Sequence, residues 1–329
     1  MPTIRDVAER AGVSVGTASR VLAGHPSTSE SSRAAVHAAA ADLGYRVDGR
    51  ARALRLMRSH TLGLLVSDVR NPFFSELAHA ADQAASEAGY LCLLANANED
   101  AAQERRYFEA FGAQKVDGVL ATPQSADNSE LDRLLEEGVP VVFVDRVVAG
   151  VEVPSVTVDN AGGIRQALEH LRRRGHRRVG YIAGPAGVST SVARFEAYSR
   201  FAAEMGFDTD SSLVTGGDFR VESGILAAQS LLDLAEPPTA ILAADGLMAV
   251  GAYTVISARW SGSPLVELVS FDDLDVFTNL HLPISAVNND PGAMGAKGVE
   301  MLLRALDGDA VESIVLPTRF IDRAPRGKQ

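Results

Sequence analysis

The sequence contains little cysteine and no long apolar stretch. Cys92 is the single cysteine among 329 residues, so no disulfide can form within the chain. No window approaches the roughly 18 apolar residues of a membrane-spanning helix, and the N-terminus has no apolar stretch like the core of a signal peptide. These absences argue against a membrane or exported protein and favour a cytoplasmic one.

Motifs of common enzymes are missing as well. The seven histidines show no HExxH or other metal-ligand spacing, and neither a GxGxxG nor a P-loop sequence is present. Residues 12–16 match the GxSxG pattern of hydrolases, but that motif needs a buried strand before its serine, whereas here a helical pattern precedes Ser14. The sequence therefore predicts that the protein is not an enzyme and needs no metal or cofactor.

Positive charge is concentrated at the start of the chain. Residues 1–60 hold nine arginines and five acidic residues, whereas the other 269 residues hold 22 Lys and Arg against 37 Asp and Glu. The formal net charge of the whole chain is −11. A small basic region on an acidic protein is expected where that region meets a polyanion, so double-stranded DNA is the first partner to consider.

The basic region has the periodicity of three short helices. The apolar residues of 4–11 fall at i, i+3, i+4 and i+7, and Gly12 follows where a left-handed C-terminal residue belongs. Ser14 is suited to cap a second helix. Ser29 is suited to cap a third, which Gly44 would close. Two helices joined by a tight turn and supported by a third predict a helix-turn-helix.

The second helix would present one face to solvent or to a ligand. Its apolar side chains Ala18, Val21 and Leu22 point one way, and the opposite face carries Val15, Gly16, Ser19 and Arg20. The guanidinium of Arg20 could pair with the O6 and N7 atoms of guanine in a major groove, or it could be an ordinary solvated arginine.

The segment 3–22, TIRDVAERAGVSVGTASRVL, resembles the DNA-reading segment of the LacI/GalR family of bacterial transcription regulators. Leu43-Gly44-Tyr45, Asn71-Pro72-Phe73-Phe74 and Phe271-Asp272-Asp273 match further signatures of that family, in its order and over almost the whole chain. The resemblance implies that Val15, Gly16 and Arg20 are the principal base-reading positions. It implies DNA contact for a larger set of head residues, namely Thr3, Ser14, Val15, Gly16, Thr17, Ser19 and Arg20.

Gly16 departs from the family pattern, in which this position usually has a side chain. One base contact is then missing, and the helix loses about 1 kcal/mol relative to alanine.

The segment 47–59 reads as a linker with enough Ala, Leu and Arg for about two turns of helix, too short to be stable alone in water. In the resembling family such a segment folds on the operator as a hinge helix and inserts one leucine into the minor groove. The resemblance thus implies DNA contact by Arg50, Ala51 and Leu54, with packing of Leu54 on the core as the alternative. Val47 and Gly49 replace a more usual proline and a bulkier residue, which predicts a floppier hinge.

The rest of the chain alternates between strands and helices. Apolar strand-like runs occur at 61–67, 90–95, 118–121, 139–144, 156–158, 178–183, 240–244 and 267–271. Helical stretches lie between them, among others at 74–88, 101–113, 129–137, 161–174, 191–204 and 221–234. This alternation predicts an α/β core of doubly wound parallel sheets, covered by helices on both faces.

At about 270 residues this core should split into two lobes. Crossings between them are expected near 159–163, at 289–291 and at 318–322. The expected domains are a helix-turn-helix head (1–46), a hinge (47–59) and a two-lobed part (60–329), with lobe 1 at about 60–159 and 290–318 and lobe 2 at about 160–289 and 319–329. The resemblance implies the same periplasmic-binding-protein-like core.

Residues that follow the strands are candidates for a ligand site, because such lobes bind small molecules near the carboxyl ends of their strands. Phe73, Phe74, Asp145, Asp245 and Asp272 are in such places. Each also has a plainer explanation, helix capping for the aspartates and core packing for the phenylalanines. The resemblance adds Arg194 as a ligand-clamping arginine and Phe219 as an aromatic that stacks on the ligand.

Carboxylates, guanidinium groups and aromatic faces together favour a sugar as effector, with a nucleoside or purine as the alternative. Asp245 replaces the family's common Asn and Gly246 the Asp that usually follows, so the ligand should offer hydrogen-bond donors at this point. We therefore expect a homodimeric repressor that binds a pseudo-palindromic operator and responds to a small effector. An exported sugar-binding protein of the same core is less compatible with the basic head.

Overall fold

A computed structural model gives the protein's structure for residues 2–22, 25–45, 58–124, 129–259 and 266–323. Its internal contacts divide the chain into two units, Met1–Ser59 and His60–Gln329. Arg50, Ala51 and Leu54 lie outside the described residues, and so does most of the expected hinge.

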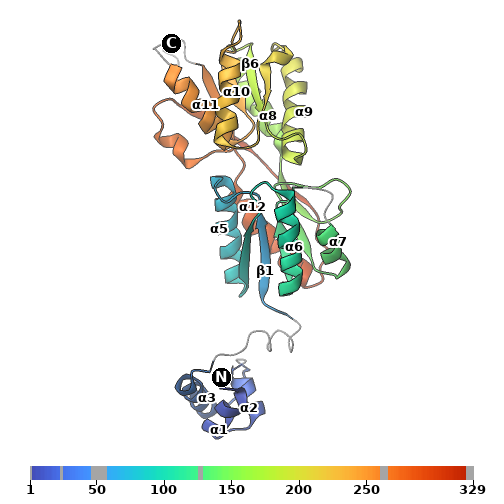
Figure 1. The fold of residues 1–329 in the computed structure, drawn as a ribbon, viewed down its shortest axis with the longest axis vertical. Coiled ribbons are helices and arrows are strands. Elements are labelled where there is room, and N and C mark those ends of the chain that lie inside the picture. The colour runs from blue at the N-terminus through green and yellow to red at the C-terminus, as the bar shows by residue number, and fades with distance from the viewer. Residues whose placement is uncertain (1, 23–24, 46–57, 125–128, 260–265, 324–329) are drawn as a thin grey trace. The chain divides into compact units, whose positions relative to one another are not determined.

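The first unit is a bundle of three helices, as the sequence predicts (Figure 1). These are α1 (Ile4–Arg10), α2 (Val15–Leu22) and α3 (Glu30–Leu43). Val7, Ala18, Val21 and Val36 are buried at its centre. Thus the apolar faces read from the sequence form the core of the bundle.

Turn residues and caps set the ends of these helices. Gly12 and Gly44 both have left-handed backbone conformations, with φ of 66° and 63°. The Thr17 amide donates to Ser14 Oγ at 3.1 Å, and the Ser32 amide donates to Ser29 Oγ at 3.2 Å. Ser14 therefore caps a helix.

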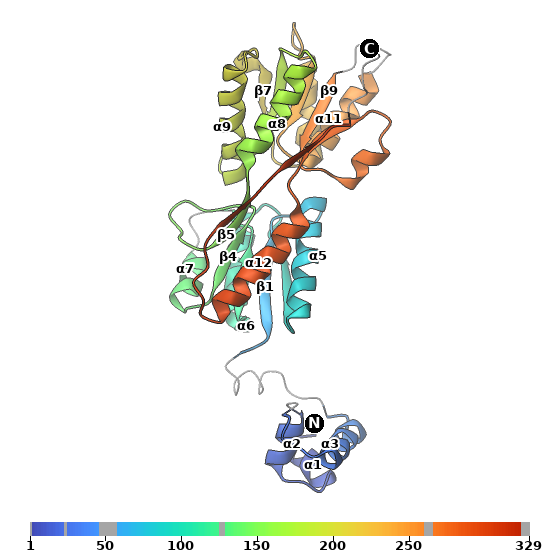
Figure 2. The same ribbon diagram turned by 180° about the vertical axis from the view of Figure 1, so that it is seen from behind.

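The second unit contains two six-stranded sheets (Figures 1 and 2). The first has the order β11-β5-β4-β3-β1-β2. Its strands are β1 (Thr61–Val66), β2 (Leu91–Asn96), β3 (Gly118–Ala121), β4 (Val141–Val144), β5 (Ser155–Val158) and β11 (Ile314–Leu316). Its helices are α5 (Pro72–Glu87) and α12 (Pro291–Leu306), which share one apolar core with the sheet, and α6 (Ala101–Gln114) and α7 (Ser129–Glu136), which share another.

The second sheet has the order β12-β10-β9-β8-β6-β7. Its strands are β6 (Val179–Ala183), β7 (Val214–Gly216), β8 (Ala240–Ala243), β9 (Glu267–Phe271), β10 (Ile284–Asn288) and β12 (Arg319–Ile321). Helices pack here in two pairs, α8 (Asn160–Arg173) with α9 (Ser189–Glu204) and α10 (Val221–Leu232) with α11 (Gly246–Arg259). Short 3-10 helices occur at Ser211–Leu213 and Asp275–Asn279.

The predicted doubly wound parallel architecture is confirmed, with one difference at an edge. β12 pairs with β10 in the antiparallel direction. It does so because only two residues lead from the carboxyl end of β11 in the first sheet into the second sheet, which β12 therefore enters at the carboxyl ends of its other strands. Arg319–Ile321 is thus a strand, and the chain passes between the sheets at 317–318.

The chain passes between the two sheets three times, and each passage follows the carboxyl end of a strand. It leaves the first sheet after β5, returns after β10 and leaves again after β11. The passages contact one another, since the Asp159 amide donates to the Leu316 carbonyl at 2.9 Å and Thr318 Oγ1 donates to the Asp159 carbonyl at 3.2 Å. This arrangement turns the carboxyl ends of both sheets toward each other.

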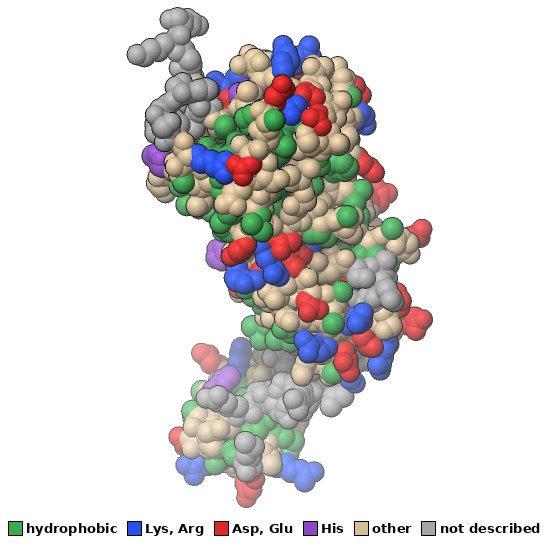
Figure 3. Space-filling view, turned by 45° about the horizontal axis from the view of Figure 1, so that its top comes forward, with side chains coloured by type: hydrophobic (Ala, Val, Ile, Leu, Met, Phe, Trp, Pro, Cys, Tyr) green, Lys and Arg blue, Asp and Glu red, His purple; other side chains and the backbone are tan. Residues whose placement is uncertain are grey.

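No helix in the described part of the chain is long and apolar enough to cross a membrane. On the face drawn in Figure 3, residues 60–323 show acidic and basic side chains in alternation rather than one basic field. On this face, the second unit therefore shows a surface of mixed charge.

Candidate functional site

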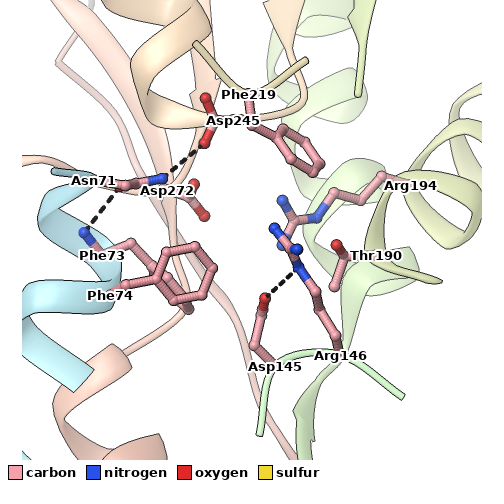
Figure 4. Close-up of a pocket in the computed structure, with 10 residues that line it drawn as sticks. All are labelled: Asn71, Phe73, Phe74, Asp145, Arg146, Thr190, Arg194, Phe219, Asp245 and Asp272. Atoms are coloured by element: carbon pink, nitrogen blue, oxygen red, sulfur yellow. Dashed lines mark hydrogen bonds and ion pairs between the residues drawn. The ribbon is translucent and has the colours of Figure 1, made fainter. Parts of the chain in front are cut away.

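Ten residues line a small cavity of about 20 Å³ at the carboxyl ends of the two sheets (Figure 4). They come from both sheets and are Asn71, Phe73, Phe74, Asp145, Arg146, Thr190, Arg194, Phe219, Asp245 and Asp272. All seven residues expected from the sequence to bind an effector are among them. Topology brings these residues together from positions up to 199 apart, because each follows a strand or begins a helix.

Three of these residues have a left-handed backbone. The φ angles are 63° for Asp145, 64° for Phe219 and 77° for Asp272. Non-glycine residues adopt this region only at a cost, and such strain gathers at functional sites. Gly184 makes room for the Phe219 ring, because a Cβ at that position would overlap it. The backbone here is shaped to aim particular side chains into the cavity.

Two of the three cavity carboxylates also hold the surrounding loops. Asp272 accepts from Asn289 Nδ2 at 2.8 Å and from the Gly246 amide at 3.2 Å. Asp245 caps α11 by accepting from the Met248 amide at 2.9 Å. The plainer explanation of helix capping therefore applies to Asp245 together with its place in the cavity wall.

Asp145 differs from these two. Its Oδ1 atom is buried and has no hydrogen-bond partner in the part of the chain that the structure describes. Its Oδ2 atom lies 3.6 Å from Arg146 Nε, beyond hydrogen-bond length. Asp145 thus offers an unused acceptor inside the cavity.

Burial shifts the ionisation of all three carboxyls. Desolvation raises the pKa of Asp145 to about 6 and, with repulsion from Asp272 added, the pKa of Asp245 to about 8. Desolvation also raises the pKa of Asp272, against the opposing attraction of Arg194. Three carboxyls in one small cavity cannot all ionise freely without a compensating charge.

The two arginines of the cavity are already held by other groups. Arg146 donates from both terminal nitrogens to Glu99, each at 2.8 Å. Arg194 donates to Asn160 Oδ1 at 2.7 Å and to the Ala244 carbonyl at 2.8 Å, and it lies 3.7 Å above the centre of the Phe271 ring. These contacts fix the guanidinium planes before any ligand arrives.

Aromatic rings form further parts of the wall. The guanidinium carbon of Arg146 lies 5.4 Å from the ring centres of both Phe74 and Phe219. Phe73 and Phe74 pack edge to face, with centres 5.0 Å apart, and both also belong to the apolar core of the first sheet. The two explanations of these phenylalanines, core and cavity, therefore hold together.

Hydrogen bonds join the two sheets around the cavity. Asn71 Nδ2, before α5, donates to Asp245 Oδ2 at 3.2 Å. The Val147 amide, after β4, donates to Ser189 Oγ at the start of α9, at 3.0 Å. These bonds hold the cavity in a closed form.

The first unit has its own candidate surface on α2. Val15 is 43% exposed, and Gly16 and Arg20 are also exposed, whereas Ala18 and Val21 are buried. Arg20 Nε donates to the Gly16 carbonyl of the same helix at 3.3 Å. Thr17 and Ser19 are half-buried, and Thr3 and Ser14 are exposed helix caps.

Both units match protein-family models. Residues 3–48 match the model described as bacterial regulatory proteins, lacI family, and residues 59–324 match the one described as periplasmic binding proteins and sugar binding domain of LacI family. The HTH-type transcriptional regulator CelR of Thermobifida fusca is 35% identical over 332 residues, or 98% of this chain and 97% of that protein. The ribose operon repressor of Halalkalibacterium halodurans is 31% identical and covers 98% and 96%.

The chain belongs to the LacI family of bacterial transcription regulators.

Solved structures of that family agree. The CelR–cellobiose complex aligns with a TM-score of 0.74 at 33% identity, over 98% of this chain and 99% of that one. The Lac repressor dimer bound to operator and the anti-inducer ONPF aligns with a TM-score of 0.86 at 25% identity, over 98% of each chain. The expected family and fold are confirmed, and membership of a regulator family confirms that the chain is not an enzyme.

Three cavity residues were not among those expected to touch a ligand. Asn71 and Arg146 stand within or beside motifs used above, and their position next to expected residues was an available signal. Thr190 begins α9 one turn before Arg194 and carries no sequence signal of its own.

The departure from the LacI-family pattern at Gly246 has a structural reason. A Cβ at this position would come within 2.8 Å of Leu274 Cγ, so the close packing of Leu274 requires glycine here.

The neighbouring residues Asp272 and Asp273 have different roles, since Asp272 lines the cavity. Asp273 is outside this cavity and forms a two-bond ion pair with Arg323, at 2.7 and 3.1 Å.

Proposed function

We propose that the protein is a cytoplasmic repressor that binds a pseudo-palindromic operator as a homodimer and releases or grips it according to a sugar in the cavity of the second unit. The observation that carries the proposal is the convergence of three buried carboxyls, two fixed guanidinium groups and three aromatic rings on one cavity, in a chain that also bears an exposed helix-turn-helix surface.

The head supports the DNA part of the proposal. The exposed face of α2 presents Val15, Gly16 and Arg20, and a guanidinium there suits the acceptors of guanine in the major groove. Arg5 and Arg33 are exposed as well and are available for phosphates. We therefore expect affinity for DNA that falls steeply with salt, because phosphate contacts release counterions.

The cavity supports the effector part. A carboxylate accepts hydrogen bonds from vicinal hydroxyls, a guanidinium donates to ring and hydroxyl oxygens, and an aromatic face covers the C–H surface of a sugar. The CelR relative was solved with cellobiose, and another relative is a ribose operon repressor. The rings of Phe74 and Phe219 also suit a base, so nucleosides are the second class of candidate.

An apolar sheet edge supports the homodimer. β2 is the outer strand of the first sheet and exposes Leu91, Leu93 and Leu94, with exposed fractions of 72%, 41% and 55%. An edge strand with exposed leucines is a surface for association rather than for solvent. Two-fold pairing of subunits then predicts two half-sites in the operator.

The effector can act only if it binds the gripping and the releasing conformations unequally. The bonds from Asn71 to Asp245 and from Val147 to Ser189 join the two sheets, so a ligand that makes or breaks them changes the relative position of the sheets.

A thermal-shift screen of sugars and nucleosides on the full-length protein tests the proposal, followed by DNA-binding assays on genomic fragments with and without each hit. A ligand that binds the folded protein raises the unfolding temperature, and the rise grows with the ligand concentration relative to its Kd. We expect a sugar to stabilise the protein and to change its affinity for one palindromic fragment. A protein that ignores every duplex at low salt would contradict the regulatory role, and stabilisation by nucleosides alone would replace the sugar.

A further inference from the structure

The charges around the cavity do not balance. Four carboxyls, those of Glu99, Asp145, Asp245 and Asp272, surround two guanidinium groups. Glu99 takes both terminal nitrogens of Arg146, so that pair is neutral in sum. Among the described residues of the cavity, Arg194 is then left to face three aspartates.

Protonation of the aspartates reduces this excess of negative charge. All three aspartates are at least nine-tenths buried, and burial raises the pKa of Asp145 and of Asp245 well above the ordinary range. A neutral sugar would leave the imbalance in place. A ligand with a positive charge would reduce it, since a cation stabilises the ionised form of each neighbouring carboxyl.

We propose that the effector is a polyol that carries a protonated amine, and that Asp245 and Asp145 are its specificity-determining residues. This inference rests on the proposed function and names the class of effector. It goes beyond the sequence argument from Asp245, which called only for hydrogen-bond donors.

The geometry leaves a place for the amine. Figure 4 shows Asp245 and Asp272 on one side of the cavity and the guanidinium groups of Arg146 and Arg194 on the other. An ammonium group on the aspartate side would face acceptors and avoid the guanidinium groups. There it would take over the position of the Asn71 amide, which now donates to Asp245 Oδ2 over 3.2 Å.

The remaining groups suit the rest of such a ligand. Asp145 Oδ1 is a buried acceptor without a partner among the described residues, ready for a hydroxyl or ammonium donor. The faces of Phe74 and Phe219 already lie 5.4 Å from one cation, and aromatic faces attract ammonium groups in the same way. Because Arg146 Nε is buried without a hydrogen-bond partner among the described residues, an acceptor oxygen is required beside the amine, which favours an amino sugar over a bare polyamine.

Matched sugars test the inference by calorimetry on the full-length protein at pH 7. One pair is cellobiose and the β-1,4-linked disaccharide of glucosamine, and the other is glucose and glucosamine, with N-acetylglucosamine as a control of similar shape without the charge. We expect the amino member of at least one pair to bind about tenfold more tightly or better than its neutral partner, and the acetylated sugar to lose that advantage.

Variants assign the preference to the aspartates. Asp245→Asn keeps the shape of the side chain and the bond from the Met248 amide, and we expect it to abolish the preference for the amine. If Asp245→Asn does not fold, Asp145→Asn takes its place as the test, and we expect it to reduce the preference. Asp273→Asn, outside the cavity, should retain it. Equal or tighter binding of the neutral sugars overturns the inference and leaves the sugar-responsive regulator intact. If none of the sugars binds, both the proposed amino-sugar class and the proposed sugar effector are overturned. The DNA-binding assays test the regulatory role separately.

Discussion

The two candidate surfaces of this protein are built in opposite ways. On α2 the side chains proposed to read DNA lie side by side on one exposed helix face, and few other parts of the chain touch them. In the cavity, the polar groups are buried and come from several strand ends and helices of both sheets, and most are held by a second residue. A surface that binds a hydrated polyanion can be formed by residues that are close in the sequence. A site that surrounds a small molecule needs residues from distant parts of the sequence, which the order of the strands brings together.

Among the substitutions that test this difference between the two surfaces, the largest effect on function is expected at Asp272. Asp272→Ala removes the acceptor for the Gly246 amide and for Asn289 Nδ2, and each buried donor left without a partner costs about 1–3 kcal/mol. We expect the ligand-induced change in DNA binding to disappear, while DNA binding itself persists. Calorimetry and a gel-shift assay on one preparation measure both.

Asp273→Ala is the matched control for this variant. Asp273 is adjacent in sequence but pairs with Arg323 outside the cavity, so its loss should leave ligand affinity unchanged. Normal ligand affinity in Asp272→Ala would remove Asp272 from the site.

A change on α2 should have the converse effect. Arg20→Ala removes an exposed guanidinium whose bond to the Gly16 carbonyl is its own helix's backbone, so the fold loses little. A guanidinium paired with guanine contributes about 1–3 kcal/mol, which predicts a loss of roughly 5- to 150-fold in affinity for the palindrome. Effector affinity should not change. Equal loss of both activities would indicate a folding defect instead.

The homodimer links the two surfaces and can be broken at the edge of the first sheet. Leu94→Lys places a charge among the exposed leucines of β2, and we expect monomers in analytical ultracentrifugation and a large loss of affinity for the two-half-site operator. Val315→Lys is the control, because Val315 is 63% exposed on β11 at the opposite edge of the same sheet. If both variants stay dimeric, another surface forms the dimer.

The cavity should also respond to pH in a way that the head does not. An aspartate of the unfolded chain ionises above about pH 4, but burial in the folded protein raises the pKa of Asp245 to about 8. Between these values the folded state binds more protons, so stability falls as pH rises from 5 to 8. Asn71, Asp272 and Arg194 are the groups that face it.

The difference between wild type and Asp245→Asn isolates this contribution, since all other titrating groups are shared. Thermal unfolding of the ligand-free proteins should show the variant gaining stability relative to wild type as pH rises. A constant difference across the range would mean that Asp245 is ionised throughout.

The same contrast explains what the sequence could and could not predict. The ends of the head helices could be predicted from the capping side chain of Ser14 and from the glycines Gly12 and Gly44. Local periodicity identified the exposed face of α2. Phe73, Asp145 and Asp272 were expected in one site because strand ends converge in doubly wound sheets. Thr190 was missed because its place depends on how α9 packs. The strands β7, β10, β11 and β12 were also missed, and the antiparallel pairing of β12 is made by a strand distant in sequence.

The smallest expected effect concerns Gly16. Its Cβ position is open, with Ser14 Oγ the nearest atom at 3.8 Å, so Gly16→Ala should stabilise the head by about 0.5–1 kcal/mol through helix propensity alone. Gly12→Ala is the contrasting control: its φ of 66° suits glycine, and the same added methyl should destabilise the turn. Thermal unfolding of the two variants compares them. If Gly16→Ala stabilises the head without weakening operator binding, glycine at this position serves neither folding nor DNA contact, and the missing side chain becomes a site where base preference can be engineered. If operator binding weakens instead, the DNA backbone or a base edge approaches α2 closely at this point. The exposed face of α2 would then have no room for an added methyl group in the complex with DNA, although that room exists in the free protein.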